Sequence, residues 1–250
     1  RIPVNFPRII GHEIIGEIVE IGAEVQGLAL GDPVTAYYYL NCGNCRRCNE
    51  SLEPLCENSG GNIGKEIDGG YAEFIKLPGR NFIKLPEGLD YKSAPADLAV
   101  ICDAIATPYK VNRRTDTKAG ETVAVFGAGG GLGLHQVMLS SWAGARVIAI
   151  DTKSAKLDAC RVAGAEETLD ASSIDVTEAL LDLTQGRGVD VAIDYVSAKE
   201  TLEQAISGLG VKGRMVTLGG SAEVFKLDAR QLLLREADVM GSRYASYSEI

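Results

Sequence analysis

Apolar and polar positions change their pattern near residue 107 of this chain. Beyond it, short apolar runs alternate with segments in which apolar residues recur at helical spacing. The runs predicted to form strands are Thr122–Phe126, Arg146–Ile150, Val189–Tyr195, Arg214–Leu218 and Asp238–Gly241. The segments predicted to form helices are Leu134–Trp142, Lys153–Val162 and Lys199–Leu209. This alternation predicts an α/β fold with a doubly wound parallel sheet whose strands are covered on both faces.

The first part of the chain shows no such alternation. Its short apolar stretches are separated by glycine, proline and asparagine, and the predicted strands are Ile14–Gly22, Asp32–Tyr37 and Tyr71–Leu77. This pattern is typical of a compact antiparallel β domain with long loops. We therefore expect two domains, a β domain over residues 1–107 and a parallel-sheet domain over residues 108–250.

Composition and charge exclude several classes of protein. Hydrophobic residues make up 46% of the chain and charged residues 24%, as in ordinary globular domains. The formal net charge is −9 and the basic residues are scattered, which disfavours binding to nucleic acid or to an anionic membrane. No apolar run reaches the roughly 20 residues that span a bilayer. No signal peptide opens the chain, so the cytoplasm is the default compartment.

Four of the six cysteines gather in one short segment. Their spacing is Cys42-x2-Cys45-x2-Cys48-x7-Cys56. Short loops of this kind aim four thiolates at the corners of a tetrahedron, which suits zinc and leaves no coordination position for a substrate. We predict a structural zinc site in a lobe over about residues 40–60, with two disulfides or an iron–sulfur centre as the alternatives. Cys160 stands apart and is expected to be a small core residue.

A glycine-rich turn follows the first strand of the predicted parallel sheet and opens its first helix. Its candidate cofactor-binding residues are Gly127, Gly129, Gly130, Gly131, Leu132 and Gly133, one residue longer than the usual Gly-x-Gly-x-x-Gly spacing. Glycines there let the backbone approach a pyrophosphate at the helix N-terminus. Asp151 ends the second strand, where a carboxylate accepts hydrogen bonds from ribose hydroxyls and repels a 2′-phosphate. The turn and Asp151 together predict NAD rather than NADP.

The two histidines and a Cys-Asp pair are the other candidates for metal chemistry. His12 lies in Gly11-His12-Glu13, at the start of a predicted strand, and alone it indicates little. His135 falls in the first turn of the helix after the glycines, where packing or a polar contact is the expected role. Cys102 and Asp103 lie where the two parts of the chain meet.

These motifs together resemble the zinc-containing medium-chain alcohol dehydrogenase family. The segment Gly11–Gly22 is similar to a zinc-binding signature of that family, and the Cys42–Cys56 cluster is similar to its structural-zinc lobe. The glycine turn with Asp151 resembles its NAD domain, and the matches follow the family's order along essentially the whole chain. The resemblance implies a Rossmann NAD-binding domain preceded by a partial GroES-like catalytic domain.

The resemblance also implies a catalytic zinc between the two domains. One ligand would be His12, with Glu13 near the metal and able to exchange with water. A further ligand of the family lies four residues before the threonine of a Thr-x-Tyr segment. Here Thr107-Pro108-Tyr109 places Asp103 at that position, and Cys102, one residue earlier, is the competitor.

Three further expectations come from the resemblance. Lys156, five residues after Asp151, matches a family position that helps to hold the adenosine ribose. The family's first zinc ligand is a cysteine well upstream of the histidine, yet only eleven residues precede His12 and none is cysteine. The family also continues beyond the last sheet strand, so the chain is expected to be a fragment truncated at both ends.

The expected activity is zinc-dependent hydride transfer between a primary or secondary alcohol and NAD, giving an aldehyde or ketone. The expected cofactors are NAD and two zinc ions, one structural and one catalytic in the complete enzyme. The alternatives are a non-catalytic NAD- and zinc-binding relative or inactive fragment, and a zinc-free quinone or enoyl reductase. The expected partners are a small-molecule alcohol or carbonyl substrate and further copies of the chain, in a dimer or tetramer.

Overall fold

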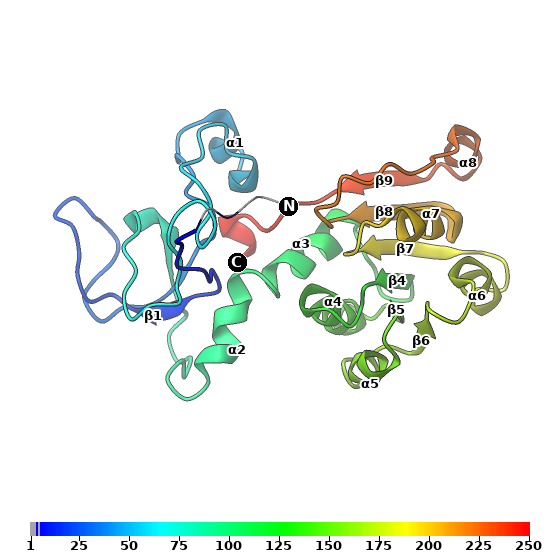
Figure 1. The fold of residues 1–250 in the computed structure, drawn as a ribbon, viewed down its shortest axis with the longest axis horizontal. Coiled ribbons are helices and arrows are strands. Elements are labelled where there is room, and N and C mark those ends of the chain that lie inside the picture. Colours follow the sequence, from blue (N-terminus) through cyan, green and yellow to red (C-terminus); the bar gives the residue numbers. More distant parts are fainter. Residues whose placement is uncertain (1–3, 5) are drawn as a thin grey trace. The chain divides into compact units, whose positions relative to one another are not determined.

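A six-stranded parallel sheet forms in the second part of the chain (Figure 1), as seen in a computed structural model that describes residue 4 and residues 6–250. Its strands are β4 (Thr122–Phe126), β5 (Arg146–Asp151), β6 (Glu167–Asp170), β7 (Val189–Asp194), β8 (Leu209–Thr217) and β9 (Asp238–Gly241). They lie in the order β6-β5-β4-β7-β8-β9, and every neighbouring pair is parallel. The chain reverses direction across the sheet between β4 and β7. The predicted doubly wound fold is therefore confirmed.

Helices accompany these strands along the chain. They are α3 (Ala106–Arg114), α4 (Gly131–Trp142), α5 (Ser154–Val162), α6 (Val176–Leu183), α7 (Lys199–Ser207) and α8 (Ala229–Arg235). No prediction covered β6, α3, α6 or α8. β6 lies at the edge of the sheet and its residues are only half-buried, so its sequence contains no continuous apolar run. Among the described residues, no helix combines the length and the apolar character needed to cross a bilayer.

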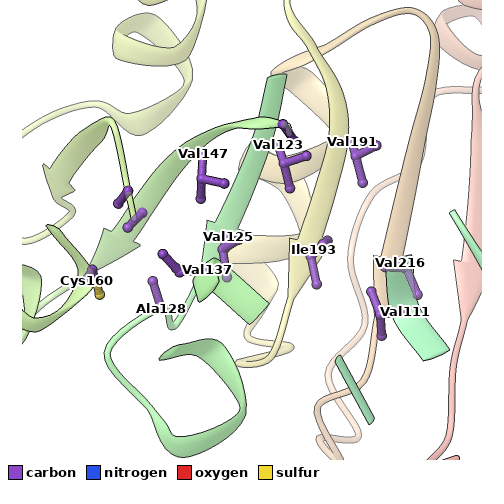
Figure 2. Packing of buried hydrophobic residues seen from close by; sticks show 13 residues of the cluster. Val111, Val123, Val125, Ala128, Val137, Val147, Cys160, Val191, Ile193 and Val216 are labelled. Atoms are coloured by element: carbon purple, nitrogen blue, oxygen red, sulfur yellow. The ribbon is translucent and has the colours of Figure 1, made fainter. Parts of the chain in front are cut away.

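Two apolar clusters cover the two faces of this sheet. Successive residues of a strand point to opposite faces: Val123 and Val125 of β4 belong to one cluster, and Ala124 and Phe126 belong to the other. Figure 2 shows the first cluster, which also takes in valines of β5, β7, β8, α3 and α4. Cys160 of α5 is fully buried within it, as predicted.

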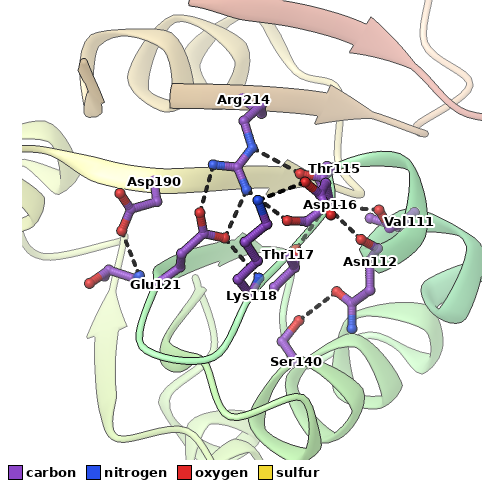
Figure 3. A network of polar contacts seen from close by, with 11 residues as sticks. Val111, Asn112, Thr115, Asp116, Thr117, Lys118, Glu121, Ser140, Asp190 and Arg214 are labelled. Carbon is purple, nitrogen blue, oxygen red and sulfur yellow. Dashed lines mark hydrogen bonds and ion pairs between the residues drawn. The ribbon is translucent and has the colours of Figure 1, made fainter. Parts of the chain in front are cut away.

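A polar clamp ties β8 to the segment that leads into β4 (Figure 3). The guanidinium of Arg214 donates to both carboxylate oxygens of Glu121, at 2.9 and 2.8 Å, and its Nε donates to the carbonyl oxygen of Thr115 at 2.8 Å. Close by, the Thr122 N–H donates to Asp190 Oδ2 of β7 at 2.8 Å. These bonds hold three strands in register at the end of the sheet remote from the glycine turn.

The first part of the chain contains a three-stranded antiparallel sheet with the order β1-β2-β3. The strands are β1 (Ile15–Glu17), β2 (Pro33–Ala36) and β3 (Phe82–Lys84), and Thr35 pairs with both Ile15 and Ile83. Short helices and 3-10 turns complete this part: α1 (Arg46–Asn49), η1 (Glu53–Leu55), η2 (Gly79–Asn81), α2 (Pro95–Ala99) and η3 (Val100–Cys102). A last 3-10 turn, η4 (Tyr247–Glu249), comes from the end of the chain.

The predicted strand over Tyr71–Leu77 is wrong, and the strand predicted over Ile14–Gly22 is limited to β1. The Tyr71 N–H donates to the carbonyl oxygen of Ile10, but no described strand pairs with the residues that follow. Tyr71 and Phe74 are 76% and 72% exposed. Alternating aromatic and polar residues suggest a strand, but without a neighbouring strand to accept its backbone hydrogen bonds the segment stays irregular.

The chain divides into two compact units, which are described separately. The second consists of Thr107–Arg243, and the first consists of the residues up to Ala106 together with Tyr244–Ile250. The sequence grouped these last seven residues with the parallel sheet, but their side chains and backbone bond within the first unit. The hydroxyl of Tyr37, for example, donates to the carbonyl oxygen of Ala245 at 2.8 Å.

Candidate metal and cofactor sites

Four sulfur atoms converge in the lobe that follows β2. The Sγ atoms of Cys42, Cys45, Cys48 and Cys56 all lie within 4.8 Å of one another, and all four thiols are free. The shortest separations are 3.5 Å for Cys45–Cys48 and 3.6 Å for Cys42–Cys56. A tetrahedral zinc ion with Zn–S bonds of about 2.3 Å places its sulfurs about 3.8 Å apart. The quartet therefore fits one zinc ion, and its separations are too long for disulfides.

Backbone amides point at these sulfurs. The Cys42 N–H donates to Cys56 Sγ and the Cys45 N–H donates to Cys42 Sγ, both at 3.3 Å. Hydrogen bonds from the Asn44 and Cys45 backbone lower the pKa of the Cys42 thiol to about 6, against the opposing effect of burial. Burial raises the pKa of Cys48 to about 12. The lobe thus stabilises thiolate character at Cys42, and the thiolate is the form that binds a metal.

The lobe has almost no apolar core of its own. α1 buries none of its residues, and in η1 only Glu53 and Pro54 are buried. Of the four cysteines, Cys45 is buried and the others are half-buried. Hydrophobic burial alone cannot stabilise a segment of this kind, so a metal ion bound by the four sulfurs would stabilise its fold.

His12 and Asp103 meet within the first unit, although 91 residues separate them in the sequence. Nε2 of His12 lies 2.9 Å from Oδ2 of Asp103. The two side chains are 30% and 19% exposed, so both are partly accessible to solvent. His12 precedes β1, and Asp103 follows η3 directly. In the described part of the chain, the cysteine quartet is the one place where three or more His, Cys, Asp or Glu ligand atoms gather.

Cys102 and Glu13 behave differently from this pair. The Cys102 thiol is fully buried and donates to the carbonyl oxygen of Ala99 at 3.4 Å, and burial raises its pKa to about 11. Glu13 Oε1 accepts a hydrogen bond from the Ala104 N–H at 3.2 Å. Two contacts therefore join the segment around Asp103 to the Gly-His-Glu motif: Asp103 with His12, and the Ala104 N–H with Glu13.

Tyrosines border His12 within the same unit. The Tyr38 ring lies 4.7 Å from the His12 ring, centroid to centroid, and stacks on Tyr244 at 5.0 Å. Burial, with the nearby charge of Asp103, raises the pKa of Tyr244 well above its usual range. Tyr37, Tyr38 and Tyr39 all belong to the buried core of this unit. All three tyrosines therefore pack inside this unit.

The glycine turn leads from β4 into α4 with close backbone approaches. Gly127 has φ +72°, and a Cβ there would lie 2.8 Å from Val196 Cγ2. A Cβ on Gly129 would collide with the Lys156 side chain, and one on Gly133 would overlap the carbonyl oxygen of Gly127. A Cβ on Gly131 would meet nothing within 4 Å. Gly127, Gly129 and Gly133 are therefore the sterically required members of the run.

Asp151 and Lys156 both lie against this turn. The Gly129 N–H donates to Asp151 Oδ2 at 2.9 Å, and Asp151 Oδ1 accepts from the Lys153 N–H at 3.1 Å. Asp151 ends β5 at the carboxyl edge of the sheet, next to the reversal between β4 and β7, where doubly wound sheets bind their ligands. The candidate cofactor residues thus come together in the second unit. His135 makes the polar contact expected of it, through Nδ1 to the carbonyl oxygen of Gly131 at 2.8 Å.

The sequence reasoning missed three residues beside these sites. Val196 follows β7 and fills the space next to Gly127. Tyr38 borders His12, and Lys65 lies over the Tyr38 ring. Only the position of Val196, just after a strand at the reversal point, carried a local signal. Tyr38 contacts His12, and Lys65 contacts Tyr38, through tertiary contacts that no local pattern encodes.

Comparisons with known proteins place the chain in a family. Residues 2–87 match the alcohol dehydrogenase GroES-like domain, and residues 131–250 match the zinc-binding dehydrogenase domain. An NAD-dependent alcohol dehydrogenase of Sulfurisphaera tokodaii is 32% identical over 248 residues, which is 98% of this chain and 70% of that protein.

Solved structures agree with this assignment. The alcohol dehydrogenase of Aeropyrum pernix matches with a TM-score of 0.88 and 34% identity, over 98% of this chain and 71% of that one. A target of the zinc-binding dehydrogenase type from Sinorhizobium meliloti 1021, solved with NADP, matches with a TM-score of 0.88 and 32% identity, over 99% and 72%. The shared domains, the relatives and the site geometry agree, and the chain belongs to the zinc-type medium-chain alcohol dehydrogenase family.

Proposed function

We propose that this protein is a zinc-dependent alcohol dehydrogenase that moves hydride between a primary or secondary alcohol and NAD. The observation that carries the proposal is the 2.9 Å contact between His12 Nε2 and Asp103 Oδ2. It joins two candidate zinc ligands from distant parts of the sequence, beside an otherwise closed tyrosine core. Family membership supports alcohols as the substrate class, and the contact supports a place for the metal.

His12 and Asp103 would hold the catalytic zinc. Zinc bonds to nitrogen and oxygen are about 2.0–2.2 Å long, so two ligand atoms in a tetrahedral site lie about 3.3 Å apart. The observed separation is slightly shorter, and a small side-chain shift would admit the ion. A bound zinc ion supplies Lewis acidity, which lowers the pKa of a substrate hydroxyl. Cys102 is the poorer candidate, because its thiol is turned to the Ala99 carbonyl and its raised pKa disfavours the thiolate.

The residues around His12 and Asp103 would strengthen the electrostatic interactions of a bound zinc ion. Glu13, held by the Ala104 N–H, keeps a second carboxylate beside the Asp103 segment. The Tyr38 ring covers one side of His12. Aromatic walls of this kind exclude water, and electrostatic interactions strengthen where water is excluded.

Asp151 supports NAD as the cofactor. The similar protein from Sinorhizobium meliloti was solved bound to NADP, so family membership alone does not decide between NAD and NADP. In this chain, both oxygens of Asp151 already accept backbone hydrogen bonds at the glycine turn, which fixes a carboxylate where the adenosine ribose is expected. A fixed negative charge there favours ribose hydroxyls and repels a 2′-phosphate. Lys156, packed on Gly129, would complete the ribose site.

The test of the reaction is NADH formation from simple primary and secondary alcohols by the intact, zinc-loaded enzyme. His12→Ala should lower kcat/KM at least about a hundredfold, because metal activation of the hydroxyl contributes several kcal/mol. His135→Ala is the matched control, since it removes the other histidine and should leave the rate within about twofold. Full alcohol oxidation by the His12→Ala variant would contradict the proposal.

The cofactor assignment has its own test. Asp151→Asn should reduce the preference for NAD over NADP by about tenfold or more, because the repulsive charge is removed. Asp170→Asn is the control, since Asp170 ends the adjacent strand β6 and pairs with Asp151 in the sheet register. An unchanged cofactor ratio in Asp151→Asn would show that this carboxylate does not select the cofactor.

A further inference from the structure

Lys65 presents a cation to Tyr38, the tyrosine that borders the candidate zinc ligand His12. Its side chain is half-buried, and its Nζ lies over the Tyr38 ring, 5.5 Å from the ring centroid. Within the described residues its ammonium forms no ion pair. A partly desolvated ammonium that contacts an aromatic face and no carboxylate can still pair with a bound anion.

The same tyrosine ring links Lys65 to His12. The Tyr38 and His12 ring centroids are 4.7 Å apart and Lys65 Nζ is 5.5 Å from the Tyr38 centroid, so the ammonium is at most about 10 Å from the imidazole centre. A substrate whose hydroxyl is at His12 would therefore need only a short carbon chain to bring a second group to Lys65.

The loop that carries Lys65 is firmly held. The Lys65 N–H donates to the carbonyl oxygen of Asn62 at 3.1 Å, and the Gly64 N–H donates to that of Ile67 at 2.9 Å. A Cβ on Gly64 would lie 2.7 Å from the carbonyl oxygen of Gly11, so the loop packs on the backbone next to His12. The ammonium thus extends from an ordered support, which is a condition for selective recognition.

The acidic residues of this loop are already engaged. Oε2 of Glu66 accepts the Asn62 N–H at 2.8 Å, and Oδ1 of Asp68 pairs with Arg8 at 3.0 Å. Neither carboxylate is turned to Lys65. These two carboxylates are therefore engaged elsewhere, and the Lys65 ammonium is available to a bound anion.

We propose that Lys65 recognises a carboxylate on the substrate, which makes hydroxy acids with a short chain between hydroxyl and carboxylate the preferred alcohols. This inference rests on the proposed function for the position of the hydroxyl. A carboxylate fits better than a phosphate, because phosphate sites usually add arginines or helix N-termini to a lysine. Arg8, the arginine that bonds to the Lys65 loop, is already paired with Asp68.

The test compares two substrates that differ only in charge, γ-hydroxybutanoate and its neutral amide. The wild-type enzyme should prefer the acid, and Lys65→Met should lower the acid-to-amide ratio of kcat/KM roughly tenfold to a hundredfold, as expected for a hydrogen bond to a charged group. Lys65→Arg should restore most of the ratio. Lys76→Met, which removes an exposed lysine of the same unit, should leave it unchanged. A ratio that survives Lys65→Met would overturn the assignment.

A binding measurement separates this inference from the proposed function. Calorimetric titration with butanoate and with butyramide, in the presence of NAD, reports the anion site without turnover. Lys65→Met should weaken butanoate binding by at least about tenfold and leave butyramide binding much less affected. If butanoate binding depends on Lys65 but no alcohol is oxidised, the proposed function fails and the anion site stands. If acid and amide are oxidised equally well and butanoate binds as butyramide does, the anion site fails and the proposed function stands.

Discussion

The cysteine lobe and the parallel sheet hold their shapes by different means. In the sheet, alternate residues of β4, β5 and β7 enter two apolar clusters, and most of those side chains are fully buried. In the lobe, α1 buries nothing, and four sulfurs within 4.8 Å of one another stand where a core would be. The difference teaches that one chain can stabilise long elements by burying apolar side chains and short elements by binding a metal ion.

The largest expected effect comes from breaking the lobe. Cys45→Ser removes the most buried of the four thiols, and zinc sites of this kind contribute apparent free energies of about 10–16 kcal/mol to folding. Hydrogen exchange should show protection lost over residues 42–56 while the strands of the sheet keep theirs. Cys160→Ala is the control, because Cys160 lies in the sheet core and should leave the lobe protected. If Cys45→Ser lost protection equally in the lobe and in the parallel sheet, the lobe would not be stabilised separately by its metal ligands.

A smaller effect comes from the core of the sheet. Ile148 of β5 is fully buried in one apolar cluster, and Ile148→Ala should lower the free energy of unfolding by about 2–5 kcal/mol in urea titrations. The zinc content of the lobe should not change. Val162→Ala removes an apolar side chain that is 91% exposed and should shift stability by less than about 0.5 kcal/mol. A similar loss in both variants would contradict the burial argument.

The smallest effect concerns the polar clamp at the end of the sheet. Glu121→Gln should cost about 1–3 kcal/mol at neutral pH, because Arg214 loses its charged partner. Unfolding of wild type and variant should be compared at pH values from neutral to strongly acidic.

The pH dependence of that difference follows from the pKa of Glu121. Burial raises this pKa, but hydrogen bonds from Arg214 and the Lys118 backbone outweigh burial and lower it overall. A carboxyl group with a lowered pKa in the fold stabilises above its unfolded pKa, and that stability is lost as pH falls through the folded value. The gap between wild type and Glu121→Gln should therefore close below about pH 4. If the difference in the free energy of unfolding persisted in acid, the loss in Glu121→Gln would come from altered packing rather than from the charge of Glu121.

The same contrast explains what the sequence could predict of the fold. β4 coincides with its predicted range, because a buried parallel strand appears as an apolar run that needs no knowledge of its partners. β9 also coincides with its predicted range, although it is an edge strand with exposed ends. β6 was missed because Leu169 is the one apolar residue among its four, so no apolar run marks it. The strand over Tyr71–Leu77 was wrong, since strand formation there depends on a neighbour that the local pattern cannot supply.

The candidate sites divide in the same way. The cysteine quartet and the glycine turn with Asp151 are local motifs, and their spacing alone led to the geometry now seen. The pairing of His12 with Asp103 was implied only by family resemblance, since nothing local connects residues 91 positions apart. Lys65 carried no signal in the sequence, because its importance depends on the Tyr38 ring that joins it to His12.

X-ray absorption at the zinc edge tests most directly the claim that a metal, rather than a core, organises the lobe. The zinc-loaded wild-type protein should show sulfur scatterers at about 2.3 Å, and Cys45→Ser should lose most of that sulfur shell. Zinc surrounded only by nitrogen and oxygen, or a sulfur shell that is unchanged in Cys45→Ser, would contradict the account.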